Sequence, residues 1–312
     1  HMAKRSAYMG WKLDFTQPHG EPALVAPDSV TWRISKNPVT GAIGGICAVL
    51  LEFAEPRIRS GVWDHSTFKV DPVGRAKRTG YAAAIGTYGP ASAAQSVISG
   101  INKMHARVAG TTPDGTEYRA LDPELIDWVG ATASFGFLTA YDRFAAPLSQ
   151  ADKDCYFGEG PEVSKLYGVQ RRPKSVDDFY SMMMQLERRF EPHEINIEFL
   201  KIVESSAKDQ HMPEKLGHYI ACAAVDILPP IVRERLELGP EYNLSHTGRI
   251  VVKAMAKLAE IIPDLKGPAA QSCQRLGLPR NFLWLSQGKQ NKLMGALRSS
   301  DVLNTAAGAT AE

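Results

Sequence analysis

The sequence predicts an all-α protein built as a single multi-helix globular domain. Its apolar residues recur at the three- and four-residue spacing of amphipathic helices. Prolines and glycines interrupt these patterns at helix-length intervals. In the second half of the chain the interruptions fall at Pro192, Pro213, Pro229-Pro230, Gly239-Pro240 and Pro263. No segment alternates apolar and polar residues as a half-buried strand does, so no sheet is expected.

Composition and charge narrow the class of protein. The chain has 312 residues, of which 44% are hydrophobic, and this is ordinary for a globular protein that buries a sizeable core. Its 36 basic and 34 acidic residues leave a formal net charge of +2, which argues against broad electrostatic binding to nucleic acid. The four cysteines, Cys47, Cys155, Cys222 and Cys273, form no C-x-x-C pair, so neither a zinc site nor a disulfide framework is indicated.

Hydropathy gives no sign of a membrane span. The longest apolar run, at residues 42–51, is too short to cross a bilayer. The first residues lack the apolar core of a signal peptide. We therefore expect a cytoplasmic protein with reduced cysteines.

Three segments are expected. Residues 1–32 contain Pro18, Gly20, Pro22 and Pro27 without a sustained period, and are predicted to form an N-terminal arm. Residues 33–298 carry the helical patterns and form the predicted main helical domain. Residues 299–312 lack bulky anchors and are predicted to be a mobile C-terminal tail.

The first strong helical pattern begins at Pro38. Its apolar positions run from Ile43 to Ala54, and Pro56 ends it. Gly44 and Gly45 lie inside this pattern, where they would let another element or a flat cofactor approach the backbone closely.

The next segment carries several charged and polar groups. Residues 61–66 are interpreted as a turn that carries His65, and Asp71-Pro72 has the pattern of an N-cap followed by proline at the first helical position. Arg75, Arg78 and Thr79 would then lie on one side of the new helix. Between residues 57 and 78, six basic side chains accompany only two acidic ones, which predicts either an exposed basic turn or a binding site for an anion. The basic residues are Arg57, Arg59, Lys69, Arg75, Lys77 and Arg78.

A histidine follows in the apolar stripe of the next helix. Ala94, Ile98, Ile101 and Val108 keep the helical rhythm, and His105 falls among them, so its ring is expected to point into the protein. Such an imidazole is either a core group satisfied by a carbonyl or a ligand of a metal or haem iron. Spacing alone does not choose between the two.

Later helices are marked by their first residues. Residues 111–115 are a predicted turn and residues 118–120 a short extended piece. Asp122-Pro123, Ser149 and Ser175 are expected to cap helices, the last covering residues 176–190. The helix after Asp122 has a predicted buried side, with Thr132 in the same stripe bonded to a carbonyl of the preceding turn. That side comprises Leu125, Trp128, Val129, Phe135, Leu138 and Tyr141.

The order and spacing of these residues resemble the catalytic domain shared by the bacterial latex-clearing rubber oxygenases and the fungal endoplasmic-reticulum oxygenase of mycophenolic acid synthesis. The similarity continues weakly from Tyr141 to Arg233. The residues that carry the resemblance are Leu50-Leu51, Ala54, Pro56, Gly61-Val62, His65-Ser66, Asp71-Pro72, Arg75, Arg78-Thr79, His105, Val108, Gly110, Tyr118, Ala120, Asp122-Pro123 and Trp128-Val129.

The resemblance implies an all-helical fold and, as in the rubber oxygenases, a b-type haem held by one histidine, which by motif position is His105. Two positions depart from the family pattern. Glu55 stands where the family usually has a histidine, and Arg78 precedes Thr79 where rubber oxygenases have a lysine. An arginine keeps the charge but cannot donate or accept a proton as a lysine can, so the chemistry is expected to differ from rubber cleavage.

The function implied by the resemblance is that of a haem b-dependent oxygenase that uses O2 or peroxide on a small apolar or aromatic organic substrate. His105 would hold the iron, and His65 would carry protons, because imidazole titrates near neutrality. Arg75, Arg78 and Thr79 would lie near the reactive face or the haem carboxylates. No nucleic acid partner is expected, and a homodimer is left open.

Two other readings are kept. In the first, Asp64, His65 and His105 form a two-histidine, one-carboxylate site of a non-haem metal oxidoreductase. In the second, the chain is a cofactor-free helical binding protein of the same fold. An absorption spectrum separates the three, because only haem gives an intense Soret band.

Overall fold

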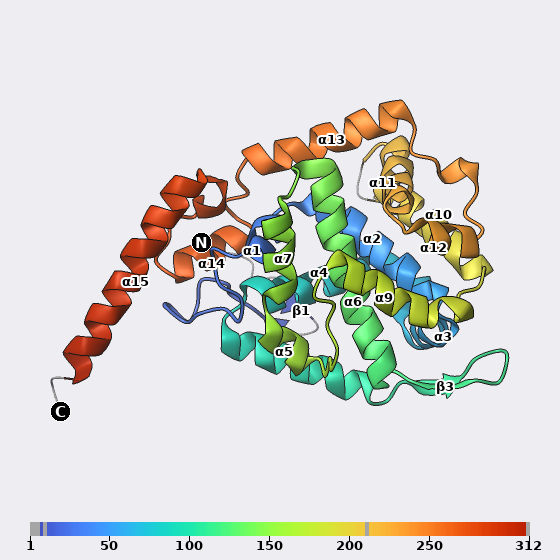
Figure 1. The fold of residues 1–312 in the computed structure, drawn as a ribbon, viewed down its shortest axis with the longest axis horizontal. Coiled ribbons are helices and arrows are strands. Elements are labelled where there is room, and N and C mark those ends of the chain that lie inside the picture. Colours follow the sequence, from blue (N-terminus) through green and yellow to red (C-terminus); the bar gives the residue numbers. More distant parts are fainter. Residues whose placement is uncertain (1–6, 9–10, 210–211, 310–312) are drawn as a thin grey trace.

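The structure is a computed structural model that describes residues 7–8, 11–209 and 212–309, and over these residues it is mostly helical (Figure 1). The prediction of a single all-α domain is therefore confirmed. Its helices are α1 (Val30–Ser35), α2 (Pro38–Ala54), α3 (Pro56–His65), α4 (Pro72–Tyr88), α5 (Ala91–His105), α6 (Pro123–Ala140), α7 (Gln150–Gly158), α8 (Pro161–Leu166), α9 (Val176–Leu186), α10 (Glu194–Asp209), α11 (Glu214–Asp226), α12 (Pro230–Arg235), α13 (His246–Ile261), α14 (Pro268–Arg275) and α15 (Gln287–Ala309). Five short helical turns are η1 (Thr67–Lys69), η2 (Tyr141–Ala145), η3 (Glu187–Arg189), η4 (Pro240–Tyr242) and η5 (Phe282–Trp284).

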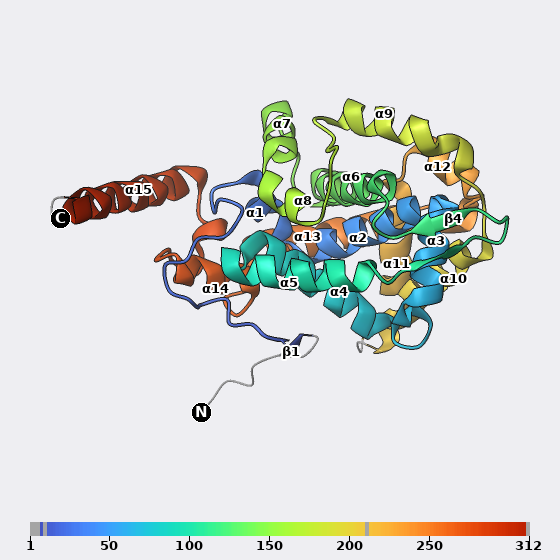
Figure 2. The same cartoon turned by 90° about the horizontal axis from the view of Figure 1, so that it is seen from below.

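Helix α2 lies at the centre of the fold (Figure 1). It contacts α1, α3, α6, α10, α11, α12, α13 and η2. Cys47, Leu50 and Leu51 are completely buried in the main core. Figure 2 shows α4 and α5 side by side along one flank of α2. A central helix whose apolar residues meet neighbours on nearly all sides explains why the pattern from Pro38 is so strongly apolar.

Two glycines set the closest helix contact. A Cβ added to Gly44 of α2 would lie 2.7 Å from the carbonyl oxygen of Gly136 in α6, which is closer than a side-chain carbon and a backbone oxygen can approach. The backbones of α2 and α6 therefore touch where each helix carries a glycine. The prediction that another element approaches the backbone at Gly44 is confirmed, and that element is α6.

The helix starts follow the predicted capping. Asp71 accepts the backbone N–H of Gly74, and Asp122 accepts that of Glu124, each with a proline at the first helical position. Ser149 forms a capping box with Asp152, and Ser175 accepts the N–H of Asp178. These predictions are confirmed because a cap depends on residues close in sequence.

A second core packs the described part of the N-terminal arm against α4, α14 and η5. Phe15 and Val25 are buried there with Tyr88 and Phe282. The guanidinium of the fully buried Arg275 donates to the carbonyl oxygens of Phe15 (2.7 Å), Glu21 (2.8 Å) and Tyr88 (2.6 Å). This group joins the arm, α4 and α14 in one place.

The limits of the three predicted segments stay predictions. Residues 1–6 and 9–10 of the arm and 310–312 of the tail lie outside the described residues. Residues 299–309 continue α15 as a helix. The mobility of the tail stays a prediction, which amide hydrogen exchange or NMR relaxation would test.

The expectation of no sheet was wrong in two places. Strand β1 (Ala7–Tyr8) pairs antiparallel with β2 (Trp11–Lys12), and β3 (Ala109–Thr111) pairs with β4 (Glu117–Arg119). Strands of two or three residues are too short to show an alternating pattern. The predicted turn at residues 111–115 closes the second hairpin, with Gly115 at φ +90°.

Two further expectations are corrected. Residues 61–66 are not a turn, because α3 continues from Pro56 to His65. Gly61 lies within α3 and faces the Tyr118 ring, which a Cβ at this position would meet at an ordinary contact distance of 3.4 Å. On α6, Val129 is 38% exposed, whereas the other apolar residues predicted for the buried side are buried. The buried side of α6 is thus narrower than its apolar pattern.

Among the described residues, no single helix is both long and apolar enough to cross a bilayer. Helices α2 and α3 meet that criterion only as a pair bent by 112°, and α2 is a core helix. All four cysteines are free thiols, and Cys47, Cys222 and Cys273 are buried.

Candidate functional site

Four helices bring Glu52, Arg75, His105 and Thr132 to one region beside α2. Thr132 Oγ1 on α6 lies 3.3 Å from Glu52 Oε1 on α2. The guanidinium of Arg75 on α4 is close enough to both Glu52 and His105 of α5 for its charge to affect both pKa values. We call these four residues the Glu52 cluster. It unites two residues predicted as site residues with two that were not.

Glu52 has the most unusual electrostatics of the cluster. Burial raises the pKa of its carboxyl to about 7, although the Arg75 charge and the Thr132 hydroxyl both act to lower it. A carboxyl with this pKa is partly protonated at neutral pH and can both accept and donate a proton. Shifts of this kind are concentrated at catalytic sites, although structural groups can show them too.

Sequence reasoning missed Glu52, and one signal could have found it. It is the sole charged residue between Pro38 and Ala54, in an otherwise apolar helix. A charge placed in a core helix is costly unless it is paired or neutralised, so its presence calls for an explanation.

The face of α2 that carries Glu52 is only partly covered. Gly41, Gly45, Val49 and Glu52 share this face and are all half-buried, whereas the neighbouring positions of the helix are mostly buried. A Cβ added at Gly41 or Gly45 would meet no atom within 4 Å. This side of the central helix therefore has room beside it, next to a titrating carboxyl.

Helix α4 is loosely packed over the same stretch. Its buried residues begin only at Ala82, ten positions after the helix starts at Pro72. A Cβ at Gly80 would also meet no atom within 4 Å. The Arg75-to-Gly80 turn of α4 thus faces space that other groups can enter.

His105 is placed differently from its prediction. It is the last residue of α5 and is exposed, so the expectation of an inward-pointing ring was wrong. It does share the side of α5 that buries Ala94 and Ile98, but no residue of α5 after Ile98 is buried. The nearby protein still desolvates the ring, and this effect and the Arg75 charge lower its pKa. The imidazole is therefore neutral at pH 7, which is the form that binds iron.

Arg75, Arg78 and Thr79 do not act as one group. Arg75 Nη1 donates to Thr79 Oγ1 at 3.2 Å, and its guanidinium lies 5.6 Å from the centre of the Phe68 ring. Arg78 instead donates to Asp71 Oδ2 at 3.1 Å and to the Thr67 hydroxyl. The predicted common side holds for Arg75 and Thr79, while Arg78 is turned back to the start of its helix.

His65 lies at the other end of α3, against the β3–β4 hairpin. Its Nε2 is 3.2 Å from the Tyr118 hydroxyl, and both His65 and Asp64 are exposed. Among the described residues, no three His, Cys, Asp or Glu side chains are arranged to hold a metal ion. The structure thus offers no support for a metal site made of Asp64, His65 and His105. The scattered histidines His193 and His218 bond to Ile195 and Glu204, and His211 is outside the described residues.

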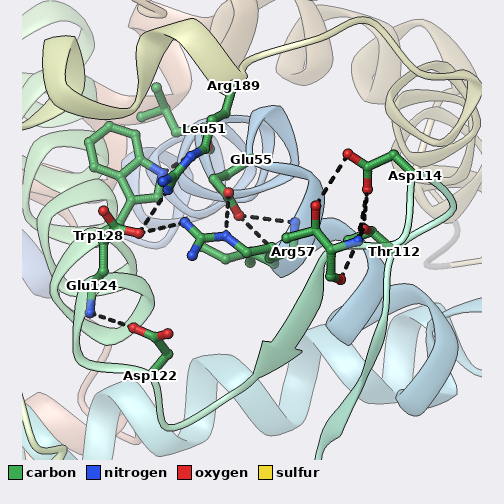
Figure 3. Close-up of polar contacts among 11 residues, drawn as sticks. Leu51, Glu55, Arg57, Thr112, Asp114, Asp122, Glu124, Trp128 and Arg189 are labelled. Carbon is green, nitrogen blue, oxygen red and sulfur yellow. Dashed lines mark hydrogen bonds and ion pairs between the residues drawn. The ribbon is translucent and has the colours of Figure 1, made fainter.

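Most of the predicted basic cluster is bound within the fold. Arg57 pairs with Glu55 at 2.7 Å and with Glu124 at 2.6 Å, and Arg189 joins the same Glu124 (Figure 3). The buried Arg59 pairs with Glu191. Lys69 lies 5.0 Å from the Trp63 ring centre. Because Arg57 and Arg59 are paired with carboxylates, the six basic residues do not form one anion-binding site in the described structure.

Glu55 has a structural role that explains its presence before Pro56. The side chain is 0% exposed, and its carboxylate accepts the backbone N–H groups of Arg57 and Ile58. It therefore caps α3 while it pairs with the Arg57 guanidinium (Figure 3). The residue that departs from the family pattern fixes the sharp bend between α2 and α3.

The Glu52 cluster contains the types of group from which a b-type haem site is built. Such a site needs a neutral imidazole, a cationic partner for the haem carboxylates and an apolar surface against the ring. His105 supplies the first and Arg75 the second. Gly41, Gly45 and Val49 supply apolar surface with the space that a Cβ would fill left open. Two surface cavities lie elsewhere, one among Glu187, Glu191 and Glu234 and the other along residues 170–178.

Comparison with known proteins identifies the family to which the chain belongs. The family model described as "ER-bound oxygenase mpaB/B'/Rubber oxygenase, catalytic domain" matches residues 32–260, well over half of the chain. Uncharacterised proteins of Mycobacterium bovis and Mycobacterium tuberculosis are each 27% identical over 119 residues, which is 37% of this chain and 47% of each relative. The chain thus spans about half the length of the curated relatives it matches. No solved structure gives a significant match.

Proposed function

This chain belongs to the family of the ER-bound oxygenase mpaB and rubber oxygenase catalytic domains, and we propose that it is a haem b-dependent oxygenase. The oxidant is O2 or peroxide, and the substrate is a small apolar or aromatic organic molecule. The observation that supports this most strongly is the Glu52 cluster, where a carboxyl with a pKa of about 7 lies beside a cation, a neutral imidazole and a partly open apolar face.

Each residue of the cluster has a proposed task. Haem b, when bound, supplies the iron at which the oxidant is activated. His105 holds the iron through its neutral ring, and Arg75, steadied by its bond to Thr79, binds a haem carboxylate. Thr132 Oγ1 lies 2.8 Å from the Val129 carbonyl oxygen and 3.3 Å from Glu52 Oε1, so it donates its one proton to the ionised carboxylate or, when Glu52 is protonated, accepts from it and donates to Val129. The hydroxyl thereby orients the carboxyl.

Glu52 is the proposed proton carrier. Near pH 7 its Oε1 or Oε2 takes up a proton from the substrate or returns one to it, because the two protonation states have nearly equal free energy. The apolar face at Gly45 and Val49, against which the haem ring would lie, helps to exclude water from the carboxyl. Arg78, which bonds to Asp71, takes no part in this transfer. His65 stays the second proposed proton carrier, at the Tyr118 hydroxyl.

The test is an absorption spectrum with iron content, on the parent and three variants. We expect a Soret band in the parent, and its loss or conversion to that of weakly held haem in His105→Ala. His65→Ala should keep the band, and a changed rate would assign His65 its proton-carrying role. Glu52→Gln keeps the shape of the side chain, so it should keep haem but lose turnover and the rise of rate with pH around 7.

Three results would contradict the proposal. If the parent protein binds no haem on reconstitution, the proposed cofactor is wrong. An unchanged spectrum in His105→Ala moves the ligand elsewhere. Full turnover in Glu52→Gln shows that the carboxyl carries no proton in the reaction.

The four free thiols suit a reducing compartment, so we also propose a cytoplasmic location. Fractionation of cells that express the tagged protein tests this directly.

A further inference from the structure

The outer face of α13 carries an exposed apolar stripe. Ile250 is 56% exposed, Leu258 54%, Ile261 72% and the following Ile262 62%, and Leu265 continues the row at 44%. We call these five residues the α13 ridge. Helix α13 runs along one edge of the molecule in Figure 1. Contiguous aliphatic side chains at such exposures are uncommon on a protein that has no partner for them.

The ridge is not needed for packing the helix onto the fold. The opposite side of α13 buries Gly248, Val252 and Ala256 against α2, α11 and η2. Ile250, Ala254, Leu258 and Ile261 follow one another three or four residues apart and so share the outward side. The helix therefore has two apolar faces, of which the fold uses one.

The charges around the ridge are mostly positive, and the exception is the exposed Asp264, whose carboxylate accepts the backbone N–H groups of Lys266 and Gly267. Lys253 and Lys257 are both exposed and lie on the turns next to Ile250 and Ile261. The sole acidic residue of α13, Glu260, points to the core, where it accepts from Asn37 (2.8 Å) and Tyr141 (2.9 Å) and pairs with Lys36. On its exposed side α13 thus combines aliphatic residues with two exposed lysines.

We propose that the α13 ridge docks on the surface of a bilayer that contains anionic phospholipids, with the helix lying in the plane of the membrane. Aliphatic side chains would enter the boundary between head groups and acyl chains, and the two ammonium groups would meet lipid phosphates. Lysine suits this position because its long apolar stem lets the charge reach the head groups. The inference is independent of the proposed oxygenase function.

The composition of the ridge favours lipid over a protein partner. Protein interfaces are usually anchored by Trp, Tyr or Arg and contain little lysine at their centre. The ridge has no aromatic residue, and the nearby Arg249 is engaged with both carboxylate oxygens of Asp226, at 2.8 and 3.1 Å. A convex row of aliphatic side chains beside lysines is typical of an interfacial helix.

Vesicle flotation of the full chain tests the proposal. We expect the protein to float with vesicles of phosphatidylcholine and phosphatidylserine, and to bind pure phosphatidylcholine about tenfold more weakly, because each lysine near an anionic surface contributes to binding. The double variant Leu258→Ser/Ile261→Ser should lose binding to both. Lys253→Gln/Lys257→Gln should lose only the preference for phosphatidylserine.

Matched controls change equally exposed residues on other helices. Met184 on α9 is 51% exposed, and Lys201 on α10 is exposed, so Met184→Ser and Lys201→Gln should bind as the parent does. Far-ultraviolet circular dichroism confirms that every variant is folded. The proposal is wrong if the parent does not float, or if the ridge variants float like the controls. It is equally wrong if sedimentation shows a dimer that Leu258→Ser/Ile261→Ser dissociates, because a second copy then covers the ridge.

Discussion

Replacing Glu52 by Gln should make the protein more stable at pH 8 than the parent, with a gain that shrinks toward pH 5. The folded-state pKa of Glu52 is raised from its usual 4.5 to about 7. An unfolded chain therefore loses this proton near pH 4.5, whereas the folded protein keeps it until about pH 7. The stabilisation from the protonated carboxyl is complete below pH 4.5 and is lost as the pH rises to 7. Glutamine cannot ionise, so its variant escapes this loss.

The magnitude follows from the shift. Each pKa unit corresponds to about 1.36 kcal/mol, so the full shift would give about 3.4 kcal/mol. Glu52 is half-buried, and solvent reduces such effects, so we expect about 2 kcal/mol. The difference in free energy of unfolding between Glu52→Gln and the parent should rise by that amount from pH 5 to pH 8 and then stay level.

Urea denaturation of cofactor-free protein at four pH values measures this difference. Glu198→Gln is a suitable control, because Glu198 is exposed on α10 and its replacement should change the free energy of unfolding by less than about 0.5 kcal/mol at each pH. A carbon-13 titration of the Glu52 carboxyl should show a midpoint near pH 7. A stability difference that is constant between pH 5 and pH 8 would refute the reasoning, since the carboxyl would then ionise in the folded protein as it does in the unfolded chain.

Two more changes test the architecture around the site by the same denaturation assay. Gly44→Ala should lower the free energy of unfolding by about 3 kcal/mol, because the added Cβ would meet backbone atoms of Gly136 and Phe137, which cannot move aside as a side chain can. Gly45→Ala has open space at its Cβ, so it should be neutral or stabilise the protein by up to about 1 kcal/mol. Equal costs for the two variants would refute the close crossing of α2 and α6. Glu55→Ala should cost about 3 kcal/mol, from a lost helix cap and a lost charge-assisted bond to Arg57, while Glu55→Gln, which can still cap α3, should cost about half of that. Similar costs for the two Glu55 variants would show that the cap contributes nothing.

Sequence reasoning succeeded where the cause of a structure is local. The caps at Asp71, Asp122, Ser149 and Ser175 depend on a few adjacent residues, and all were found. The bond from Thr132 to the carbonyl of the preceding turn is local too, and it was predicted. The all-helical class follows from many such patterns together.

It failed where the cause lies in another part of the chain. The raised pKa of Glu52 comes from burial by helices far along the sequence, and no spacing in α2 shows it. His105 lies on the predicted side of its helix, but whether that side is covered depends on where other elements end. Arg75 and Arg78 share a helix side, yet Asp71 and Thr67 draw only Arg78 away. Periodicity predicts the side of the helix on which a side chain lies, whereas residues distant in the sequence determine whether that side chain is buried and which group it contacts.

The bonds of Arg275 have a consequence for how the chain folds as it is made. They join this residue to Phe15 and Glu21, across sequence separations of 260 and 254 residues. Contacts of such long range close a large loop and so form late. On the ribosome, α2, α4, α5 and α6 have all emerged long before Arg275. The four residues of the Glu52 cluster can therefore assemble during synthesis, whereas the bonds that join the carbonyl groups of Phe15 and Glu21 to Arg275 form only after α14 has been made.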